Sequence, residues 1–208
     1  MLKPQLTPLS QAYIKHQSTM QAPMIHNDQH QSQGKTALGD RIMKVNHAGE
    51  HGAICIYTAQ IFLARLTAPG LVEELIEFRS HERAHRAVFD AELQRRGQAK
   101  CRSYHVCGIG GYTLGLLTSL FGTSAISATT VAIESVVLRH LQQQITALSS
   151  GNVIDTSAIN AIKIIIEEEQ LHHDHSARHC KADGFWSRLL GPIVAASTET
   201  VIWLGMRL

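Results

Sequence analysis

Two copies of the motif Glu-x-x-His lie far apart in this chain of 208 residues, and a single glutamate precedes each copy at a similar distance. The motif residues are Glu82 and His85 in the first copy, and Glu169 and His172 in the second. The preceding carboxylates are Glu50, 32 residues before Glu82, and Glu134, 35 residues before Glu169. Four carboxylates and two imidazoles in this order are the ligand set of a four-helix bundle that holds two iron or two manganese ions. Such a metal pair implies chemistry with dioxygen or peroxide.

The first motif lies in a helical pattern that predicts a buried position. Residues three apart share one face of an α-helix, so the Glu and His of each copy can reach one ion from a single turn. Apolar residues continue that face at spacings of three and four, at Leu71, Leu75, Phe78, Phe89 and Leu93. This pattern is typical of a buried seam. A carboxylate buried in it without a partner would cost several kcal/mol, so the seam needs a cation or a hydrogen-bond network.

The other three glutamates also share a face with apolar residues. Glu134 is in register with Val131, Val137, Leu138, Leu141, Ile145 and Leu148; Glu169 follows Ile162, Ile165 and Ile166; Glu50 shares its side with Ile54, Tyr57 and Ile61. We therefore predict two ions, one held by Glu50, Glu82 and His85 and the other by Glu134, Glu169 and His172. Glu82 and Glu169 are the expected bridges. A carboxylate-rich set with one imidazole per ion favours iron or manganese over zinc, and we expect iron.

Other acidic and histidine residues are interpreted as background to this site. Five glutamates fall off the apolar faces or cluster as a solvated face: Glu73, Glu74, Glu77, Glu167 and Glu168. Six histidines are expected to lie behind the ligands or at the surface: His47, His51, His81, His173, His175 and His179. Asp174 is a candidate acceptor that would orient His172.

The chain reads as all-α, with five or six helices. Capping and breaking residues predict one helix from about Asp40 to Leu66, a second from about Leu71 to Arg96, a third ending near Ser150, and a fourth from near Asp155 to near Gly184. Residues 1–36 carry seven glutamines and no clear period. We expect them to form a flexible polar extension, and 37–208 to form one domain. No basic segment followed by an apolar one opens the chain, so we expect no secretory signal and four free thiols.

Two apolar segments suggest a membrane surface. Residues 106–133 include no charged residue and no histidine, and 28 residues would suffice to cross a bilayer. Five glycines and the direct continuation into Glu134 favour instead a helix lying on the bundle or on a membrane surface. Residues 192–206 are similar, with Glu199 as their only charge and with Trp186 and Arg188 just before them. Ordinary core helices are the alternative for both segments. The net charge of +2 and the lack of a basic run give no reason to expect nucleic acid as a partner.

Three stretches of sequence resemble the Coq7-type demethoxyubiquinone hydroxylases. They are Val45-Asn-His-Ala-Gly-Glu50-His-Gly-Ala, Val131-Ala-Ile-Glu134-Ser and Glu168-Glu169-Gln-Leu-His172-His173-Asp174, and the Glu82-Arg-Ala-His85 pair stands between them in the same order. The resemblance covers about residues 40–208. It implies a ferritin-like bundle at the periphery of a membrane, with a di-iron centre formed by the six residues named above. Leu141 departs from the family, whose members often have Tyr about two turns after the third-helix glutamate, and this puts any role of that Tyr in doubt here.

The same resemblance implies a monooxygenase that uses O₂ to hydroxylate the ring of a polyprenylated methoxy-methyl-benzoquinol, in ubiquinone biosynthesis. It places the protein on the cytoplasmic face of the cell membrane, or on the matrix face of the inner mitochondrial membrane in a eukaryote, with other ubiquinone-biosynthesis proteins as candidate partners. An apolar entrance for this substrate would be lined by Tyr112, Leu116, Leu117, Leu120 and Phe121, or these residues would be core. The alternatives are a ferritin-like protein that only oxidises and handles iron, and a metal-free helical adaptor.

Overall fold

The computed structural model describes residues 29–150 and 154–207, and within these ranges all regular structure is helical. The elements are α2 (Gln29–Thr67), the short 3₁₀ helix η1 (Pro69–Leu71), α3 (Val72–Arg95), α4 (Tyr104–Ser119), α5 (Thr123–Ser149), α6 (Thr156–Arg178) and α7 (Phe185–Gly205). The expectation of an all-α chain is therefore confirmed for the described residues.

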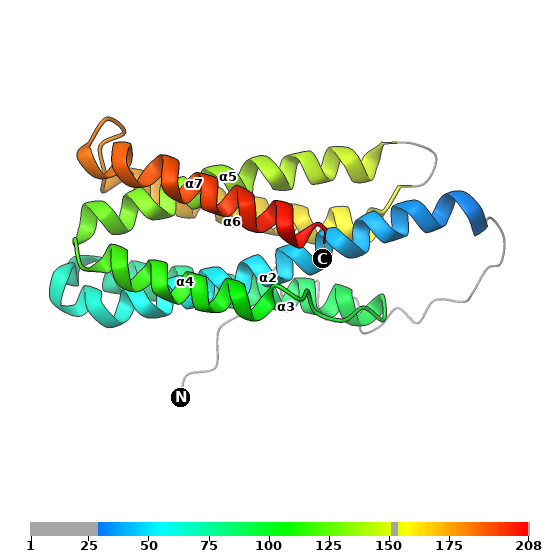
Figure 1. Cartoon of the computed structure of the whole chain (residues 1–208), viewed down its shortest axis with the longest axis horizontal. Coiled ribbons are helices and arrows are strands. Elements are labelled where there is room, and N and C mark those ends of the chain that lie inside the picture. Colours follow the sequence, from blue (N-terminus) through cyan, green and yellow to red (C-terminus); the bar gives the residue numbers. More distant parts are fainter. Residues whose placement is uncertain (1–28, 151–153, 208) are drawn as a thin grey trace.

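Four of the helices form a bundle and two cover it. α2 packs against α3, α5 packs against α6, and contacts between α3 and α6 and between α2 and α5 join the two pairs. α4 lies on α2, and α7 lies on α5 (Figure 1). Each of the four bundle helices carries one of the predicted glutamate positions, so the bundle brings together residues that are more than a hundred positions apart in the chain.

The predicted apolar faces form the interior of this bundle. On α3, Leu75, Phe78, Phe89 and Leu93 are buried, and Leu71 is buried at its start. On α6, Ile162 and Ile165 are fully buried together with residues of α2, α3 and α5. The seams derived from spacing are thus the buried faces of the helices, and the motif residues sit within them.

The start of α2 differs from the expectation. Asp40 does not cap a helix, because α2 already begins at Gln29 and includes residues 29–36 of the expected extension. The Asp40 carboxylate instead accepts hydrogen bonds from Arg96 and Gln98 at the end of α3. Arg96 also contacts the carboxylates of Glu92 and Asp155, so one buried guanidinium ties α2, α3 and the start of α6 together. Residues 1–28, the remainder of the expected extension, lie outside the described residues.

The uncharged segment is not one continuous helix. Gly122, with φ of +75°, separates α4 from α5, and this left-handed conformation favours glycine. α4 approaches α2 closely at glycines: a Cβ at Gly111 would lie 2.4 Å from the Gly52 carbonyl oxygen, and one at Gly115 would lie 2.4 Å from that of Ile56. Of the helices in the described ranges, none is both long and apolar enough to cross a membrane.

The expected boundaries of α6 are half right. Asp155 caps its first turn, since its side chain accepts a hydrogen bond from the Ala158 N–H at 3.2 Å. The helix ends at Arg178, earlier than the predicted Gly184, which instead precedes the first turn of α7.

Candidate metal centre

All six residues predicted from spacing meet in the middle of the bundle. α2 contributes Glu50, α3 contributes Glu82 and His85, α5 contributes Glu134, and α6 contributes Glu169 and His172. None of the six is more than 7% exposed. They form two groups of potential ligands, each with its ligand atoms within 4.8 Å of one another: Glu50, Glu82, His85 and Glu169 in one, and Glu82, Glu134, Glu169 and His172 in the other.

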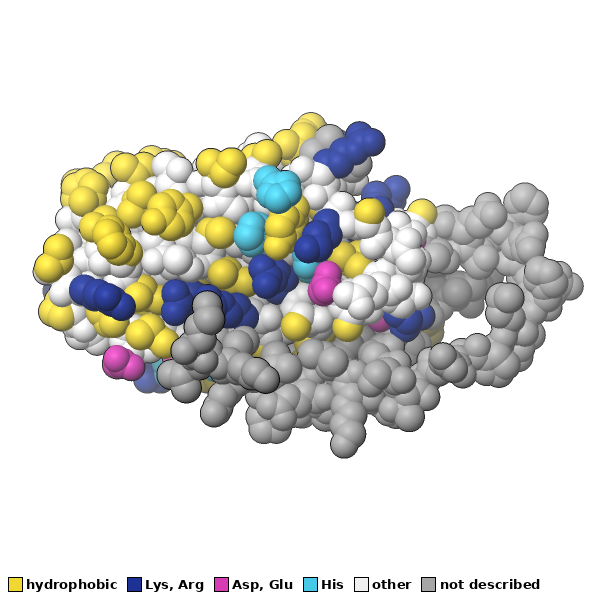
Figure 2. All heavy atoms as spheres, turned by 90° about the horizontal axis from the view of Figure 1, so that it is seen from below, with side chains coloured by type: hydrophobic (Ala, Val, Ile, Leu, Met, Phe, Trp, Pro, Cys, Tyr) yellow, Lys and Arg dark blue, Asp and Glu magenta, His cyan; other side chains and the backbone are white. Residues whose placement is uncertain are grey.

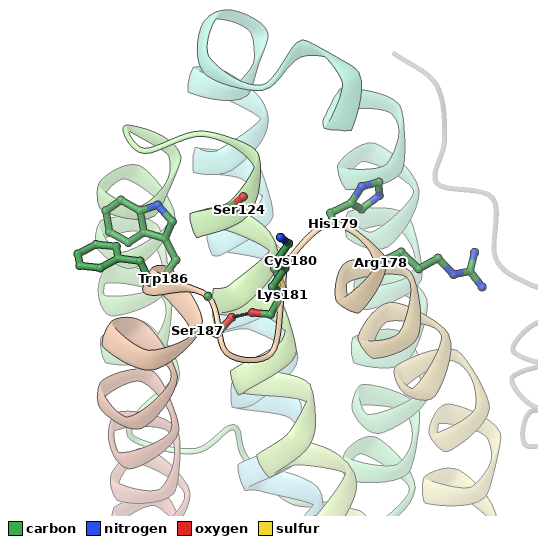
Figure 3. Close-up of a pocket in the computed structure, with 9 residues that line it drawn as sticks. Ser124, Arg178, His179, Cys180, Lys181, Trp186 and Ser187 are labelled. Carbon is green, nitrogen blue, oxygen red and sulfur yellow. Dashed lines mark hydrogen bonds between the residues drawn. The ribbon is translucent and has the colours of Figure 1, made fainter.

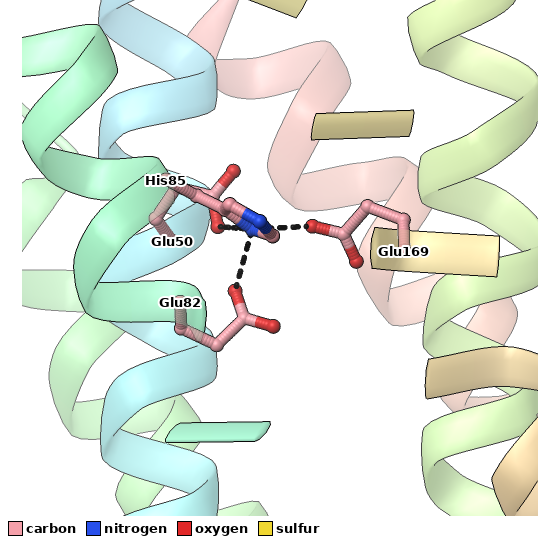
Figure 4. A group of neighbouring side chains, drawn as sticks. All are labelled: Glu50, Glu82, His85 and Glu169. Carbon is pink, nitrogen blue, oxygen red and sulfur yellow. Dashed lines mark ion pairs between the residues drawn. The ribbon is translucent and has the colours of Figure 1, made fainter. Parts of the chain in front are cut away.

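Glu82 and Glu169 belong to both groups, and each presents one oxygen to each histidine. The Nδ1 atom of His85 lies 3.0 Å from Glu169 Oε1 and 4.0 Å from Glu82 Oε2. The Nδ1 atom of His172 lies 3.2 Å from Glu82 Oε1 and 3.6 Å from Glu169 Oε2. Figure 4 shows the first group, with the carboxylates of Glu50, Glu82 and Glu169 around the His85 ring. This is the arrangement expected of two shared carboxylates between two ion positions.

Three buried atoms at the centre of the cluster make no hydrogen bond: Glu82 Oε1, His85 Nδ1 and His172 Nδ1. Such atoms cost free energy unless something satisfies them. Because both imidazoles turn the unsatisfied nitrogen toward the shared carboxylates, one cation in each ligand group would satisfy these three atoms. The residues therefore fit a pair of metal ions, and the donor set of carboxylate oxygens and imidazole nitrogens suits ions such as iron or manganese.

The electrostatics of the cluster reflect an excess of acidic groups. Burial and the neighbouring Glu82 raise the pKa of Glu50 well above its usual value, and burial and Glu169 do the same for the pKa of Glu134. Burial opposes the charged form of each histidine, but the surrounding carboxylates raise the pKa of His85 to about 10 and that of His172 to about 9. Metal binding to these groups would therefore compete with protons.

An apolar and aromatic shell surrounds the ligands. The Tyr57 hydroxyl donates to Glu134 Oε1 at 3.2 Å, and both groups are buried. The ring of Phe78 lies 4.4 Å from that of His172, centroid to centroid. Leu141, which departs from the pattern of the resembled family, is buried in the core cluster formed by α2, α3, α5 and α6. The site is therefore closed off from bulk water by its own bundle.

Two residues outside the predicted ligand set contact it, and one of them, His81, was predicted to lie behind the ligands or at the surface. Glu168 was predicted to belong to a solvated face, but its Oε2 atom lies 2.8 Å from His85 Nε2. His81 Nδ1 lies 3.0 Å from His172 Nε2. Asp174, proposed as the residue that orients His172, contacts His173 and Gln170 instead. Their positions in the sequence could have identified them, because His81 and Glu168 each stand directly before the glutamate of a Glu-x-x-His motif.

A pocket of about 380 Å³ opens at one end of the bundle, where α6 is followed by α7 (Figure 3). Its lining includes Ser124, Cys180, Lys181, Trp186 and Ser187, and the Ser187 hydroxyl donates to the Lys181 carbonyl at 2.7 Å. None of the six candidate ligands lines it. The chemistry of the buried cluster is a better guide to function than this surface hollow, because the hollow brings together no comparable set of functional groups.

The outer faces of α4 and α7 expose large apolar side chains. On α4 and just after it these include Val106, Ile109, Tyr112, Leu117, Leu120 and Phe121, and on α7 they include Phe185, Leu189, Ile193 and Trp203. The rings of Phe121 and Trp186 lie 4.6 Å apart and join the end of α4 to the start of α7. Figure 2 shows hydrophobic side chains gathered toward one end and one edge of the molecule, beside a row of Lys and Arg. Four of the five predicted entrance residues are thus exposed, which excludes the core alternative for them.

The comparisons with known proteins match this chain over most of its length. A family model described as "Ubiquinone biosynthesis protein COQ7" matches residues 37–205. The "NADPH-dependent 3-demethoxyubiquinone 3-hydroxylase, mitochondrial" of Dictyostelium discoideum is 28% identical over 174 residues, 83% of this chain and 79% of that protein. The "3-demethoxyubiquinol 3-hydroxylase" of Rhodospirillum rubrum is 29% identical over 177 residues, 82% of this chain and 79% of the relative. The human protein with the same name as the Dictyostelium one is 29% identical, over 83% of this chain and 79% of its own length.

Proposed function

Because the chain belongs to the COQ7 family of ubiquinone biosynthesis proteins, we propose that it is an O₂-dependent di-iron monooxygenase of ferritin-like fold. Its substrate would be a polyprenylated methoxy-methyl-benzoquinol, demethoxyubiquinol, and its product the ring-hydroxylated quinol. The names of the relatives support this reading, since each describes a 3-hydroxylase of demethoxyubiquinone or demethoxyubiquinol. The matched family also favours it over the iron-handling alternative.

The observation that carries the proposal is the pair of shared carboxylates between two inward-facing imidazoles. Glu50, Glu82 and His85 would hold one iron ion, Glu134, Glu169 and His172 the other, and Glu82 and Glu169 would bridge them. Two ferrous ions bound there would supply two electrons and the ring C–H bond the other two, so that, with two protons, one atom of O₂ enters the ring as a hydroxyl group and the other leaves as water. The chain itself holds the ligands rigidly on four helices and excludes water through the shell that includes Tyr57 and Phe78.

The apolar faces of α4 and α7 are proposed to rest on a membrane. A polyprenylated quinol is dissolved in the bilayer, so an enzyme acting on it must work at that surface. Exposed Val106, Ile109, Phe185 and Ile193 would enter the boundary between head groups and acyl chains, and Trp203 suits the interface. The membrane would be the cytoplasmic face of the cell membrane, or the matrix face of the inner mitochondrial membrane in a eukaryote, and other ubiquinone-biosynthesis proteins are candidate partners there.

A single-turnover reaction tests the chemistry. The reduced, iron-loaded protein is mixed with ¹⁸O₂ and a short-chain demethoxyquinol, and the product is read by mass spectrometry. A product carrying one ¹⁸O atom is expected from the wild type and from Glu167→Ala, whose side chain is exposed on α6, but not from Glu169→Ala. Oxidation of iron with no ring product would favour the iron-handling protein. A protein that takes up no iron would favour the metal-free adaptor.

Binding to vesicles tests the membrane surface separately. We expect the wild type to sediment with lipid vesicles and Ile109→Glu, Ile193→Glu to stay in the supernatant, because two charges would enter the apolar boundary. Arg102→Glu, an exposed position just before α4, is a control for charge alone. Equal sedimentation of the doubly charged variant and the wild type would rule out these faces as the contact.

A further inference from the structure

The outer nitrogens of the two candidate metal-binding histidines are held by chemically different groups. His85 Nε2 lies 2.8 Å from a carboxylate oxygen of Glu168. His172 Nε2 lies 3.0 Å from Nδ1 of His81, and the two rings are nearly parallel, at 7°. Both histidines are fully buried, whereas Glu168 and His81 are half-buried at the edge of the cluster.

These two contacts occupy equivalent places in the bundle. Glu168 stands directly before Glu169 on α6 and reaches across to the histidine of α3. His81 stands directly before Glu82 on α3 and reaches across to the histidine of α6. The residue before each Glu-x-x-His motif therefore supports the histidine of the opposite motif. The two contacts are arranged alike, and the chemistry of the supporting residue differs between them.

Tautomers follow from this geometry. An ion bound at Nδ1 of either histidine leaves the ring proton on Nε2, which then donates outward. His85 would donate to a carboxylate, which raises the basicity of the ring as a ligand, as in the carboxylate–histidine–metal arrangement of many metal sites. His172 would donate to the Nδ1 atom of an imidazole, which must then carry its own proton on Nε2. An uncharged acceptor polarises the donor ring less than a carboxylate does.

We propose that His81 and Glu168 are paired positioning residues that make the two metal positions unequal, with the ion at His85 bound more tightly than the ion at His172. This inference rests on the metal centre of the proposed function but not on the hydroxylation. The proposal assigns the difference in metal affinity to Glu168 on one side and His81 on the other. A change of residue at either position should therefore reverse or remove the difference. The positions of the four carboxylates need not change.

Titration of the full-length protein with Co²⁺ measures both positions without any turnover. Co²⁺ binding is followed by its visible absorption, with a competing chelator to obtain the two dissociation constants. His85→Ala and His172→Ala each leave one imidazole, and their spectra identify which position fills in each step. In the wild type we expect two binding steps with unequal dissociation constants. The first step should show the spectrum of the His172→Ala variant, which retains His85.

Variants at His81 separate positioning from packing. His81→Leu should weaken only the second step, by about 10- to 100-fold, the range found when such supporting residues are removed. His81→Gln keeps an acceptor in the amide oxygen and should restore most of that loss. His81→Glu places a carboxylate behind both histidines and should bring the two dissociation constants together. His173→Gln, which changes a histidine next to His172 that is bonded to Asp174, is the matched control and should leave both steps unchanged.

Coupling between variants identifies the residue through which His81 acts. His81→Leu should add no loss in a protein that already carries His172→Ala, and should keep its full effect in one that carries His85→Ala. Two equal steps in the wild type, or a His81→Glu protein whose steps stay as far apart as before, would overturn the proposal. If His81→Leu does not fold by circular dichroism, the Gln and Glu variants decide. Unequal Co²⁺ steps with no hydroxylated product would leave this inference standing while the proposed function fails.

Discussion

Replacing Tyr57 by Phe removes one hydroxyl from the shell of the candidate metal centre and nothing else. That hydroxyl donates to Glu134 Oε1 at 3.2 Å, and both residues are buried. Burial and Glu169 raise the pKa of Glu134 and so favour its neutral form in the metal-free protein, whereas metal binding requires the carboxylate. The same hydrogen bond therefore has a neutral partner in one state and a charged partner in the other.

This difference sets the expected magnitudes. A hydrogen bond between neutral groups contributes about 0.5–1.5 kcal/mol, and one to a charged group about 1.5–3 kcal/mol. In the metal-free protein Tyr57→Phe should thus lower the Tm by about 1–6 °C, at about 2–4 °C per kcal/mol for a chain of this size. The ion at Glu134 and His172 loses the additional ~1–1.5 kcal/mol, which corresponds to an affinity lower by roughly 5- to 10-fold.

Thermal melting of the metal-free protein and a Co²⁺ titration measure the two quantities separately. Tyr112→Phe removes the hydroxyl of an exposed tyrosine on α4 and should change neither. An affinity for the second ion within twofold of the wild type would refute the argument, because the hydroxyl would then make no distinction between the two states of Glu134. A fall in Tm well beyond 10 °C would show that the hydroxyl has a structural role larger than one hydrogen bond.

Three further perturbations address the fold and the protonation of the site. Gly115→Leu should lower the free energy of unfolding in urea by about 1–3 kcal/mol, because the new Cβ would lie 2.4 Å from a backbone oxygen of α2. Co²⁺ binding should stay intact. Loss of both stability and Co²⁺ binding would show that α4 is needed to form the site. Arg96→Leu removes a positive charge that lies beside the fully buried carboxylate of Glu92, so the urea midpoint should fall by the equivalent of about 3 kcal/mol. An unchanged midpoint would contradict a buried ionic junction. The pKa values of His85 (about 10) and His172 (about 9) lie above 6.5, so the stability they give the metal-free protein is complete below pH 6.5 and is lost as the pH rises toward 9–10. Saturating Co²⁺, which displaces these protons, should therefore raise the Tm more at pH 9 than at pH 6.5, and an increment that does not change with pH would count against proton displacement.

The sequence predicted which side chains meet inside the bundle because the helical period determines which residues share a buried face. On α3, one stripe at spacings of three and four contains Phe78, Glu82, His85 and Phe89, and all four are buried. Once the stripe is assigned to a buried face, the direction of the motif follows. The three-residue spacing places each motif glutamate beside its own histidine, and the contacts between α3 and α6 then bring it to the other histidine as well.

The misjudged residues depend on what lies across the bundle, which a single helix pattern does not contain. Glu168 falls off the apolar face of its own helix, yet His85 of α3 stands opposite it at hydrogen-bond distance. Aspartate is a common helix-capping residue, but the Asp40 carboxylate accepts a hydrogen bond from Arg96 at the end of α3. Helix α2 continues through Asp40. The break between α4 and α5 was missed because Gly122 lies within an apolar run, and only its positive φ makes it a turn.

Several contacts of the site cross between the two halves of the bundle, the α2–α3 pair and the α5–α6 pair. Glu169 and Glu168 of α6 reach His85 of α3, while Glu82 and His81 of α3 reach His172 of α6. Neither helix pair can complete an ion position alone, because each pair supplies one imidazole and borrows a carboxylate from the other. Metal binding would then stabilise the association of the halves as well as fill the site, so that loading and folding are one linked equilibrium. The residue before each motif contacts the histidine of the opposite half, so a carboxylate at Glu168 and an imidazole at His81 would distinguish two ion positions without any change in the backbone.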